Sequence, residues 1–421
     1  MEMLVFALLI LLFIINVPIA IALAMSAAII FIIQDSIPLL SIMQRMFSSV
    51  DSFPLLAIPF FILAGKLMES GGMSKRLIHL ANVIFGRMRG GLAVVSIIAC
   101  AFFAALSGSA AATTAAIGSI LIPAMVKKGY DRNFSAAVQA TGGTIGIVIP
   151  PSVPIILFGV AAGASISDLF IAGIIPGLFI VVSLTILVYV ISIIKGYGGG
   201  EKYNFKEFLI ALKDASLALL MPVIILGGIY GGIFTPTEAA LVAVVYGFIV
   251  GFIIYREIKL KDFYHIFTSS IQITSVIMFI IVGASVFGSY LTREKIPAQI
   301  TEFMLGLSDN WIVTLLLINL LLLVVGIFLE TAAAIIILTP ILAPVAQALG
   351  MDMVHFGIIM IVNLAIGFIT PPVGINLFVA SNIAGTKFES LIKAIVPFIL
   401  VMIVCVLIIT FLPVMSLYLV R

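Results

Sequence analysis

Charged residues are scarce in this chain of 421 residues. Asp, Glu, Lys and Arg make up 9% of it, whereas they make up about a quarter of a typical soluble domain. Hydrophobic residues reach 63%, and they form long continuous runs rather than alternating with polar residues. A soluble domain and an outer-membrane barrel are therefore both excluded. The composition predicts an all-α polytopic membrane protein.

Cysteine and histidine are also rare, with two and three residues. Cys100 and Cys405 lie inside apolar runs and are interpreted as buried small side chains rather than a disulfide or metal pair. The chain contains no phosphate-binding Gly-x-x-x-x-Gly-Lys-Ser/Thr, no His-Glu-x-x-His and no Cys-x-x-Cys motif. We therefore expect neither ATP hydrolysis nor zinc chemistry, and no enzyme. Because no basic segment precedes the first apolar run, that run is expected to be a mature helix.

The chain does contain a pattern that occurs twice. From Ser109 onward the second copy follows the first by 221 residues, and further upstream the offset is 218. The matching positions are Ser109 and Glu330, Pro123 and Pro344, Gly129 and Gly350, Asp131 and Asp352, Gly146 and Gly367, Pro150-Pro151 and Pro371-Pro372, Pro176 and Pro397, and upstream Pro18 and Pro236, Gly65 and Gly283. A duplicated apolar unit with Gly and Pro interruptions at equivalent places predicts a secondary transporter that binds its substrate where the repeats meet.

The repeat predicts the organisation of the whole chain. Repeat 1 is assigned to 1–195, with scaffold spans at 1–33 and 53–68, an interfacial arm helix at 73–89, a re-entrant hairpin at 92–128, a broken helix at 132–163 and a span at 169–194. A cytoplasmic linker follows at 196–213. Repeat 2 is assigned to 214–421, with scaffold spans at 215–255 and 268–291, a hairpin at 311–350, a broken helix at 353–382 and a span at 388–420. Each repeat then crosses the membrane about five times, and an odd number makes the two repeats inverted.

The distribution of basic residues agrees with this topology. If the N-terminus is outside, 17 of the 21 Lys and Arg residues fall on the cytoplasmic side, and only Arg45, Arg293, Lys295 and Arg421 remain outside. Such a bias is typical of multi-span proteins. The net charge of +3 is thus explained without a nucleic-acid partner.

Each repeat contains a polar hairpin tip followed by a helix that must unwind. The Pro-Pro pairs remove backbone donors, and carbonyl groups freed at membrane depth need a partner such as Na⁺. Tip amides and half-helix N-termini suit a carboxylate. We expect about two Na⁺ ions, with an organic anion between them. The predicted Na⁺ ligands are Ser107, Ser109, Gly146 and Pro150, and Thr331, Gly367, Thr370 and Gly374; the predicted substrate contacts are Thr113, Thr114, Ser152, Asn376 and Glu330.

Several of these residues have a structural alternative. The hydroxyl residues could be small residues that pack helices together, and the Pro pairs could be simple kinks. Glu330 could contact an ion or gate the substrate, or it could cap a helix. Glu238 is assigned to a capping box, Thr235-Pro236-Thr237-Glu238, and not to the site.

Four motifs resemble the large membrane (M) subunit of tripartite ATP-independent periplasmic (TRAP) transporters. They are Ser107-Gly108-Ser109-Ala110-Ala111-Ala112-Thr113-Thr114, Gly146-Ile147-Val148-Ile149-Pro150-Pro151-Ser152, Thr235-Pro236-Thr237-Glu238-Ala239 and Gly367-Phe368-Ile369-Thr370-Pro371-Pro372-Val373-Gly374-Ile375-Asn376. The resemblance implies a Na⁺-driven, elevator-type importer of organic acids in the bacterial cytoplasmic membrane. It also implies two partners: a small four-helix membrane subunit, expected as a separate chain, and a periplasmic substrate-binding protein.

Two other functions remain open. A stand-alone carrier of organic anions, coupled to Na⁺ or H⁺, would share the duplicated architecture without needing a binding protein. A channel is disfavoured, because a pore requires rings of selectivity groups around one axis and the polar groups here converge at two tips. The sequence leaves the substrate open among C4-dicarboxylates, sialic acid and similar carboxylates.

Overall fold

The computed structural model describes residues 2–35, 37–199, 203–307 and 310–421, and every regular element in them is helical. The elements are α1 (Glu2–Ile14), α2 (Ile19–Ile33), α3 (Leu39–Ser48), η1 (Phe53–Leu56), α4 (Ala57–Ser70), α5 (Met73–Phe85), α6 (Gly91–Ser107), α7 (Ala110–Lys127), α8 (Arg132–Val148), α9 (Val153–Ala162), α10 (Ile166–Ala172), α11 (Ile174–Ile194), α12 (Phe205–Tyr230), α13 (Pro236–Phe248), η2 (Ile249–Ile254), α14 (Leu260–Arg293), α15 (Ile296–Leu307), α16 (Trp311–Phe328), α17 (Thr331–Ala348), α18 (Met353–Gly367), α19 (Ile375–Ala384), α20 (Phe388–Phe411) and α21 (Val414–Leu417). The predicted all-helical class is therefore confirmed.

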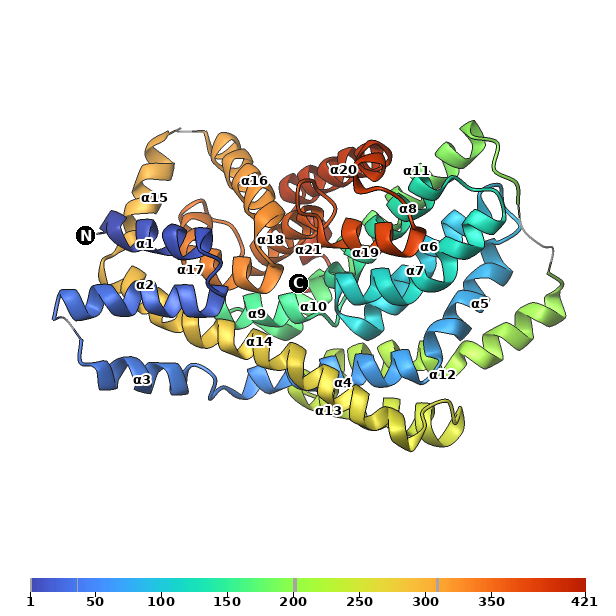
Figure 1. The fold of residues 1–421 in the computed structure, drawn as a ribbon, viewed down its shortest axis with the longest axis horizontal. Coiled ribbons are helices and arrows are strands. Elements are labelled where there is room, and N and C mark those ends of the chain that lie inside the picture. Colours follow the sequence, from blue (N-terminus) through green and yellow to red (C-terminus); the bar gives the residue numbers. More distant parts are fainter. Residues whose placement is uncertain (1, 36, 200–202, 308–309) are drawn as a thin grey trace.

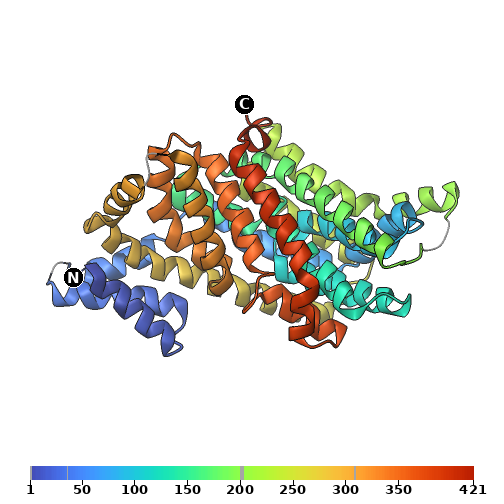
Figure 2. The same cartoon turned by 90° about the horizontal axis from the view of Figure 1, so that it is seen from above.

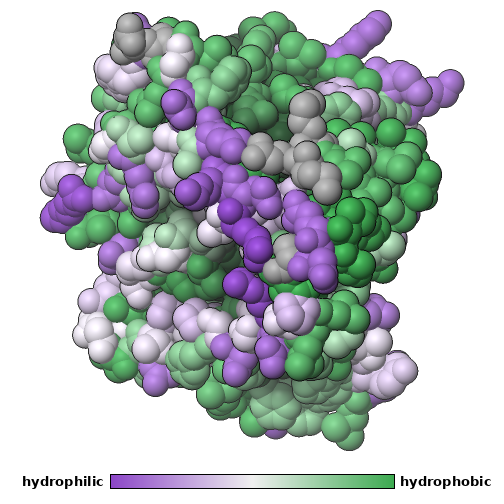
Figure 3. Space-filling model, turned by 90° about the vertical axis from the view of Figure 1, so that its left-hand side faces the viewer, coloured by the Kyte–Doolittle hydropathy of each residue, from purple (hydrophilic) through white to green (hydrophobic). Residues whose placement is uncertain are grey.

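Within these residues, nine helices are long and apolar enough to cross a membrane, or ten if the bent pair α8 and α9 counts as one span. Large apolar side chains lie exposed on their outer surfaces, including Val223, Leu320 and Leu400. Soluble proteins rarely expose apolar surface on this scale, whereas a lipid environment favours it. One end of the molecule instead presents a band of hydrophilic residues between hydrophobic surfaces, as expected where a chain leaves the membrane (Figure 3).

Helices α3, α4, α12, α13 and α14 lie along one long side of the molecule, and the hairpins and broken helices pack against them (Figure 1). The N-terminus lies at one end of the long axis and the C-terminus near its middle, after α20 has crossed the molecule (Figure 2). The two halves of the chain exchange equivalent contacts. Helix α4 packs on α13 while α14 packs on α2, and α7 packs on α19 while α17 packs on α9. The second helix of each hairpin therefore packs on the second part of the other half's broken helix.

The helix breaks follow from local sequence. Helix α8 ends at Val148, ahead of the Pro150-Pro151 pair, and α9 begins at Val153 after Ser152, whose hydroxyl caps it; the two helices meet at 41°. In the other half, α18 ends at Gly367 and α19 begins at Ile375, beyond Pro371-Pro372. Proline supplies no N–H for the helix ladder, so both helices stop where the sequence predicts. The capping box of Thr235 and Glu238 is also confirmed.

The first spans and the linker of the predicted layout can be compared with the helix bounds. Helices α1 and α2 have 13 and 15 residues, and at 1.5 Å per residue they measure about 20 Å and 22 Å, short of the roughly 30 Å of a bilayer core. Each helix alone is shorter than the core, so the two crossings expected within 1–33 stay a prediction. The linker expected at 196–213 becomes helical at Phe205, where Asn204 and Glu207 form a capping box. Its residues 200–202 lie outside the described part of the chain, as do Met1 of the first predicted span and residues 308–309 ahead of the second hairpin.

Candidate functional site

The two hairpin tips line one cavity of about 210 Å³. Its wall includes Ser107–Ala112 from the first tip and Glu330–Ala332 from the second. Helix α4 closes one side, and α9, α14 and the start of α19 contribute apolar side chains. Two segments that are 221 residues apart in the sequence therefore face the same space. The cavity is a natural place for a small ligand, since it combines apolar walls with a few convergent polar groups.

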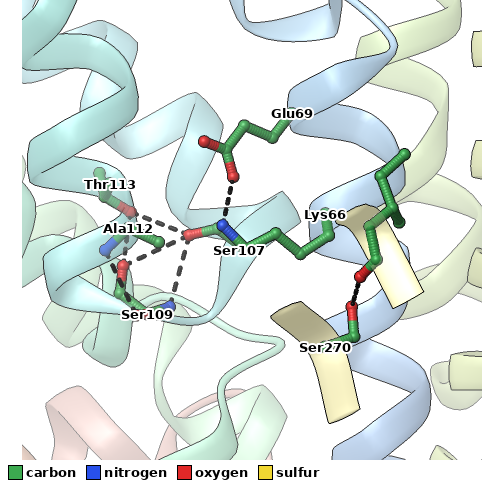
Figure 4. A network of polar contacts seen from close by, with 8 residues as sticks. Lys66, Glu69, Ser107, Ser109, Ala112, Thr113 and Ser270 are labelled. Atoms are coloured by element: carbon green, nitrogen blue, oxygen red, sulfur yellow. Dashed lines mark hydrogen bonds and ion pairs between the residues drawn. The ribbon is translucent and has the colours of Figure 1, made fainter. Parts of the chain in front are cut away.

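The first tip gathers four oxygen-bearing groups (Figure 4). The hydroxyl oxygens of Ser107 and Thr113 are 2.9 Å apart, and the Thr113 hydroxyl donates to the Ser109 carbonyl at 2.8 Å. The Ser109 hydroxyl accepts from the amide of Ala112 and so caps α7. Hydroxyl and carbonyl oxygens are the ligands that hard cations prefer. The tip therefore carries the donor set of a small cation site.

The helix break lies directly against this tip. A Cβ atom at Gly146 would stand 2.6 Å from the Thr113 hydroxyl and 2.7 Å from the Ser109 carbonyl, and one at Gly108 would stand 2.9 Å from the carbonyl of Pro151. The backbone of α8 thus reaches the tip only because position 146 has no side chain. Predicted ligands Ser107, Ser109 and Gly146 are brought together, and Thr113 joins them. The ring of Pro150 lies near Gly173.

The second tip is built differently. The Glu330 carboxylate accepts from the amides of Ala332 at 2.9 Å and Ala333 at 3.4 Å, so it caps α17. It also lines a small cavity of about 30 Å³ with Gly367 and Gly374, roughly enough room for one water-sized occupant. The Thr370 carbonyl lies beside Gly374, but the Thr370 hydroxyl donates to the carbonyl of Ile366 in α18. Thr331 faces the larger cavity. Three of the predicted residues therefore share one small space.

Four of the predicted substrate contacts do not line the cavity. Thr113, Thr114, Ser152 and Asn376 are buried, and each makes a hydrogen bond inside the helix packing. The Asn376 amide donates to the carbonyl of Ala140, which ties α19 to α8. In this conformation they hold the tips and breaks in place. Glu330 is the one predicted substrate contact that is accessible from the cavity.

The sequence interpretation missed the charged residues of α4. Its predicted substrate contacts include no Lys or Arg, yet Lys66 lines the cavity opposite the first tip, paired with Glu69 at 2.9 Å (Figure 4). Lys66 had been counted only as a cytoplasmic charge. Its spacing of three from Glu69 signals a helical ion pair but not where that pair points. Because the pair is neutral overall, Glu330 remains the one unpaired formal charge among the described cavity residues.

A bundle of long apolar helices with broken helices around an internal polar cavity is the architecture of a helical membrane transporter. Two solved structures have this fold. The YdaH transporter of Alcanivorax borkumensis aligns with a TM-score of 0.67 at 13% identity, covering 89% of this chain and 88% of that one. MtrF of Neisseria gonorrhoeae aligns with a TM-score of 0.56 at 14% identity, covering 90% and 85%.

The sequence comparisons identify the family. Residues 6–415 match the family described as "Tripartite ATP-independent periplasmic transporter, DctM component". The chain belongs to this family, so it is the large permease subunit of a TRAP transporter and not an enzyme. The resemblance noted in the sequence is confirmed.

The names of three relatives specify different substrates. The isethionate permease protein DctMQ of Oleidesulfovibrio alaskensis is 48% identical over 406 residues, covering 96% of this chain and 64% of the relative's length. The C4-dicarboxylate permease protein DctM of Pseudomonas aeruginosa is 44% identical, covering 91% and 89%. The sialic acid permease protein SiaM of Vibrio cholerae is 39% identical, covering 91% and 90%.

Two substitutions of Glu330 distinguish a role in helix capping from a role of its charge in transport. Gln keeps an oxygen that can accept from the Ala332 amide, whereas Ala removes the cap at a cost of about 1 kcal/mol. We expect Glu330→Gln to retain uptake within about threefold of the native permease, and Glu330→Ala to lower the melting temperature of the purified protein. A loss of uptake with Glu330→Gln at an unchanged melting temperature would instead assign the charge itself to coupling.

Proposed function

We propose that this permease subunit imports a small organic acid anion by Na⁺ symport across the bacterial cytoplasmic membrane. One Na⁺ ion would bind at Ser107, Ser109, Thr113 and Gly146, and a second near Thr331, Gly367, Thr370 and Gly374. The anion would lie between the tips. The observation that carries this proposal is the single cavity lined by both hairpin tips, with an oxygen cluster at the first tip and a small cavity behind the second.

Charge explains why cations are needed. The described cavity residues with formal charge are Lys66, Glu69 and Glu330, and the first two are paired. An incoming carboxylate or sulfonate therefore enters a cavity whose wall has a net formal charge of −1. Burying an uncompensated anion there is costly, and Na⁺ at the adjacent oxygen groups would offset that charge. Each ligand then raises the affinity of the other by the same factor, which is the basis of coupling.

The exchanged contacts support a moving unit. Helix α7 packs on α19 and α17 packs on α9, so the hairpins and the second parts of the broken helices form one interlocked body. Helices α2, α4, α13 and α14 pair separately as the scaffold. We propose that each body contains helices from both inverted repeats, 1–195 and 214–421. The interlocked body would carry the site across the membrane as an elevator.

Two partners complete the proposal: a small four-helix membrane subunit that supports the scaffold, and a periplasmic binding protein that delivers the substrate. The substrate is a small carboxylate or sulfonate, the class to which isethionate, C4-dicarboxylates and sialic acid belong. Support comes from membership of the tripartite family and from the names of the relatives.

Reconstitution tests this dependence. In liposomes with an inward Na⁺ gradient, the permease alone should take up labelled isethionate, succinate or sialic acid no faster than empty liposomes. With the small subunit and the loaded binding protein present, we expect uptake of one of these probes. Efficient uptake of a free anion by the permease alone would favour the stand-alone carrier instead.

A further inference from the structure

A second cavity, of about 600 Å³, lies next to the candidate site. Arg45 of α3 and Arg293 at the end of α14 line it, together with hydroxyl groups and apolar side chains from η1, α9, α14 and α17. Leu157 of α9 lines both this cavity and the cavity between the hairpin tips, so it forms part of the wall between the two. Its side chain is 2% exposed. The two spaces are therefore neighbours with a buried apolar side chain between them.

The charge of this second cavity is entirely positive. Its wall contains two arginines and, among the described residues, neither Asp nor Glu. No described carboxylate forms an ion pair with Arg45 or Arg293, and both arginines are exposed. Two uncompensated guanidinium groups at one cavity attract anions, and the planar fork of each group matches a carboxylate or sulfonate.

The hydroxyl groups of the wall have another role. Ser285, Ser289 and Thr292 donate to carbonyl oxygens of their own helix at 2.8, 2.7 and 2.9 Å. With their protons used in this way, they present lone pairs to the cavity and favour water rather than an anion. Contacts with an anion therefore fall to the two arginines.

We propose that this cavity is an outer vestibule in which Arg45 and Arg293 hold a small organic anion before it passes Leu157. The side of the membrane and the identity of the transported anion rest on the proposed function, whereas the attraction for anions does not. The vestibule carries two positive charges, while the inner cavity carries one net negative charge. An anion thus waits in the vestibule until cations have bound at the inner site.

Charged thiol reagents test the vestibule without any transport. Ser289→Cys places a near-isosteric thiol on its wall, and the native Cys100 and Cys405 are 0% and 1% exposed. Purified protein is labelled at low ionic strength with anionic 2-sulfonatoethyl methanethiosulfonate or cationic 2-(trimethylammonium)ethyl methanethiosulfonate. We expect the ratio of anionic to cationic labelling rates to fall about tenfold when Arg45→Gln and Arg293→Gln are combined, and to decline as salt is added.

Matched variants keep the test decisive. Lys295→Gln removes a cation two positions after Arg293 that does not line the cavity, and should change the ratio by less than about twofold. Arg45→Lys with Arg293→Lys retains both charges and should preserve the ratio, which controls for misfolding. An unchanged ratio in the double Gln variant, or an equal fall with Lys295→Gln, overturns the vestibule. Because labelling needs neither Na⁺ nor partner subunits, a failure of Na⁺-coupled uptake leaves this result interpretable.

Discussion

Replacing Na⁺ with choline should reduce uptake by the complete reconstituted system to the level of empty liposomes. The cavity between the tips has one net negative formal charge and an oxygen cluster at its edge, so an anion needs added cations to bind there. With about two ions, uptake should rise with Na⁺ concentration more steeply than first order. Initial rates over a series of Na⁺ concentrations, at constant pH and ionic strength, measure both effects.

The same reconstituted system can also give a result that contradicts Na⁺ coupling. Uptake that persists in choline would rule out Na⁺ as the coupling ion at both proposed sites. Protons would then be the coupling ion, and Glu330 would be their most direct carrier, since it is the cavity carboxylate without an ion-pair partner among the described residues. Reciprocity gives a control: if Na⁺ raises substrate affinity, substrate must raise Na⁺ affinity by the same factor.

Gly146→Ala should impair uptake at least tenfold with the protein still assembled. The new methyl group would lie 2.6 Å from the Thr113 hydroxyl and 2.7 Å from the Ser109 carbonyl, where it would displace two groups of the proposed first Na⁺ site. A tenfold loss corresponds to about 1.4 kcal/mol. Overpacking of this kind costs about 1–3 kcal/mol. Uptake at limiting Na⁺ should suffer more than uptake at saturating Na⁺.

A second glycine offers a matched control. Gly227 lies within α12, and a Cβ atom there would meet nothing within 4 Å. Gly227→Ala makes the same chemical change without touching the tip, and should leave both uptake and its Na⁺ dependence unchanged. If Gly146→Ala shows a native Na⁺ activation curve, the cation site does not lie at the first tip.

Local chemistry explains what could be predicted from the sequence. Composition indicates helices in a membrane, and the Pro-Pro pairs indicate where two helices end, because a missing N–H acts within one turn. The capping box of Thr235 and Glu238 is similarly local. These features require no knowledge of distant contacts, so the helix breaks and tips were located from their spacing alone.

Features that depend on three-dimensional packing could not be predicted. Whether Thr113 faces the tip cluster and Thr114 faces Gly143 depends on how α7 is rotated against α8. Lys66 reaches the cavity because α4 packs beside the first tip, although about forty residues separate them along the chain.

The exchanged packing of the two halves has a consequence for how the protein is made. Contacts between α4 and α13, α2 and α14, α7 and α19, and α9 and α17 all join segments far apart in the sequence. Such a topology has a high contact order, and contacts of this kind form only after long stretches of chain have been brought together. During synthesis the first half therefore lies in the bilayer without these packing partners until α17 and α19 have been made. The candidate site is therefore among the last parts of the molecule to assemble.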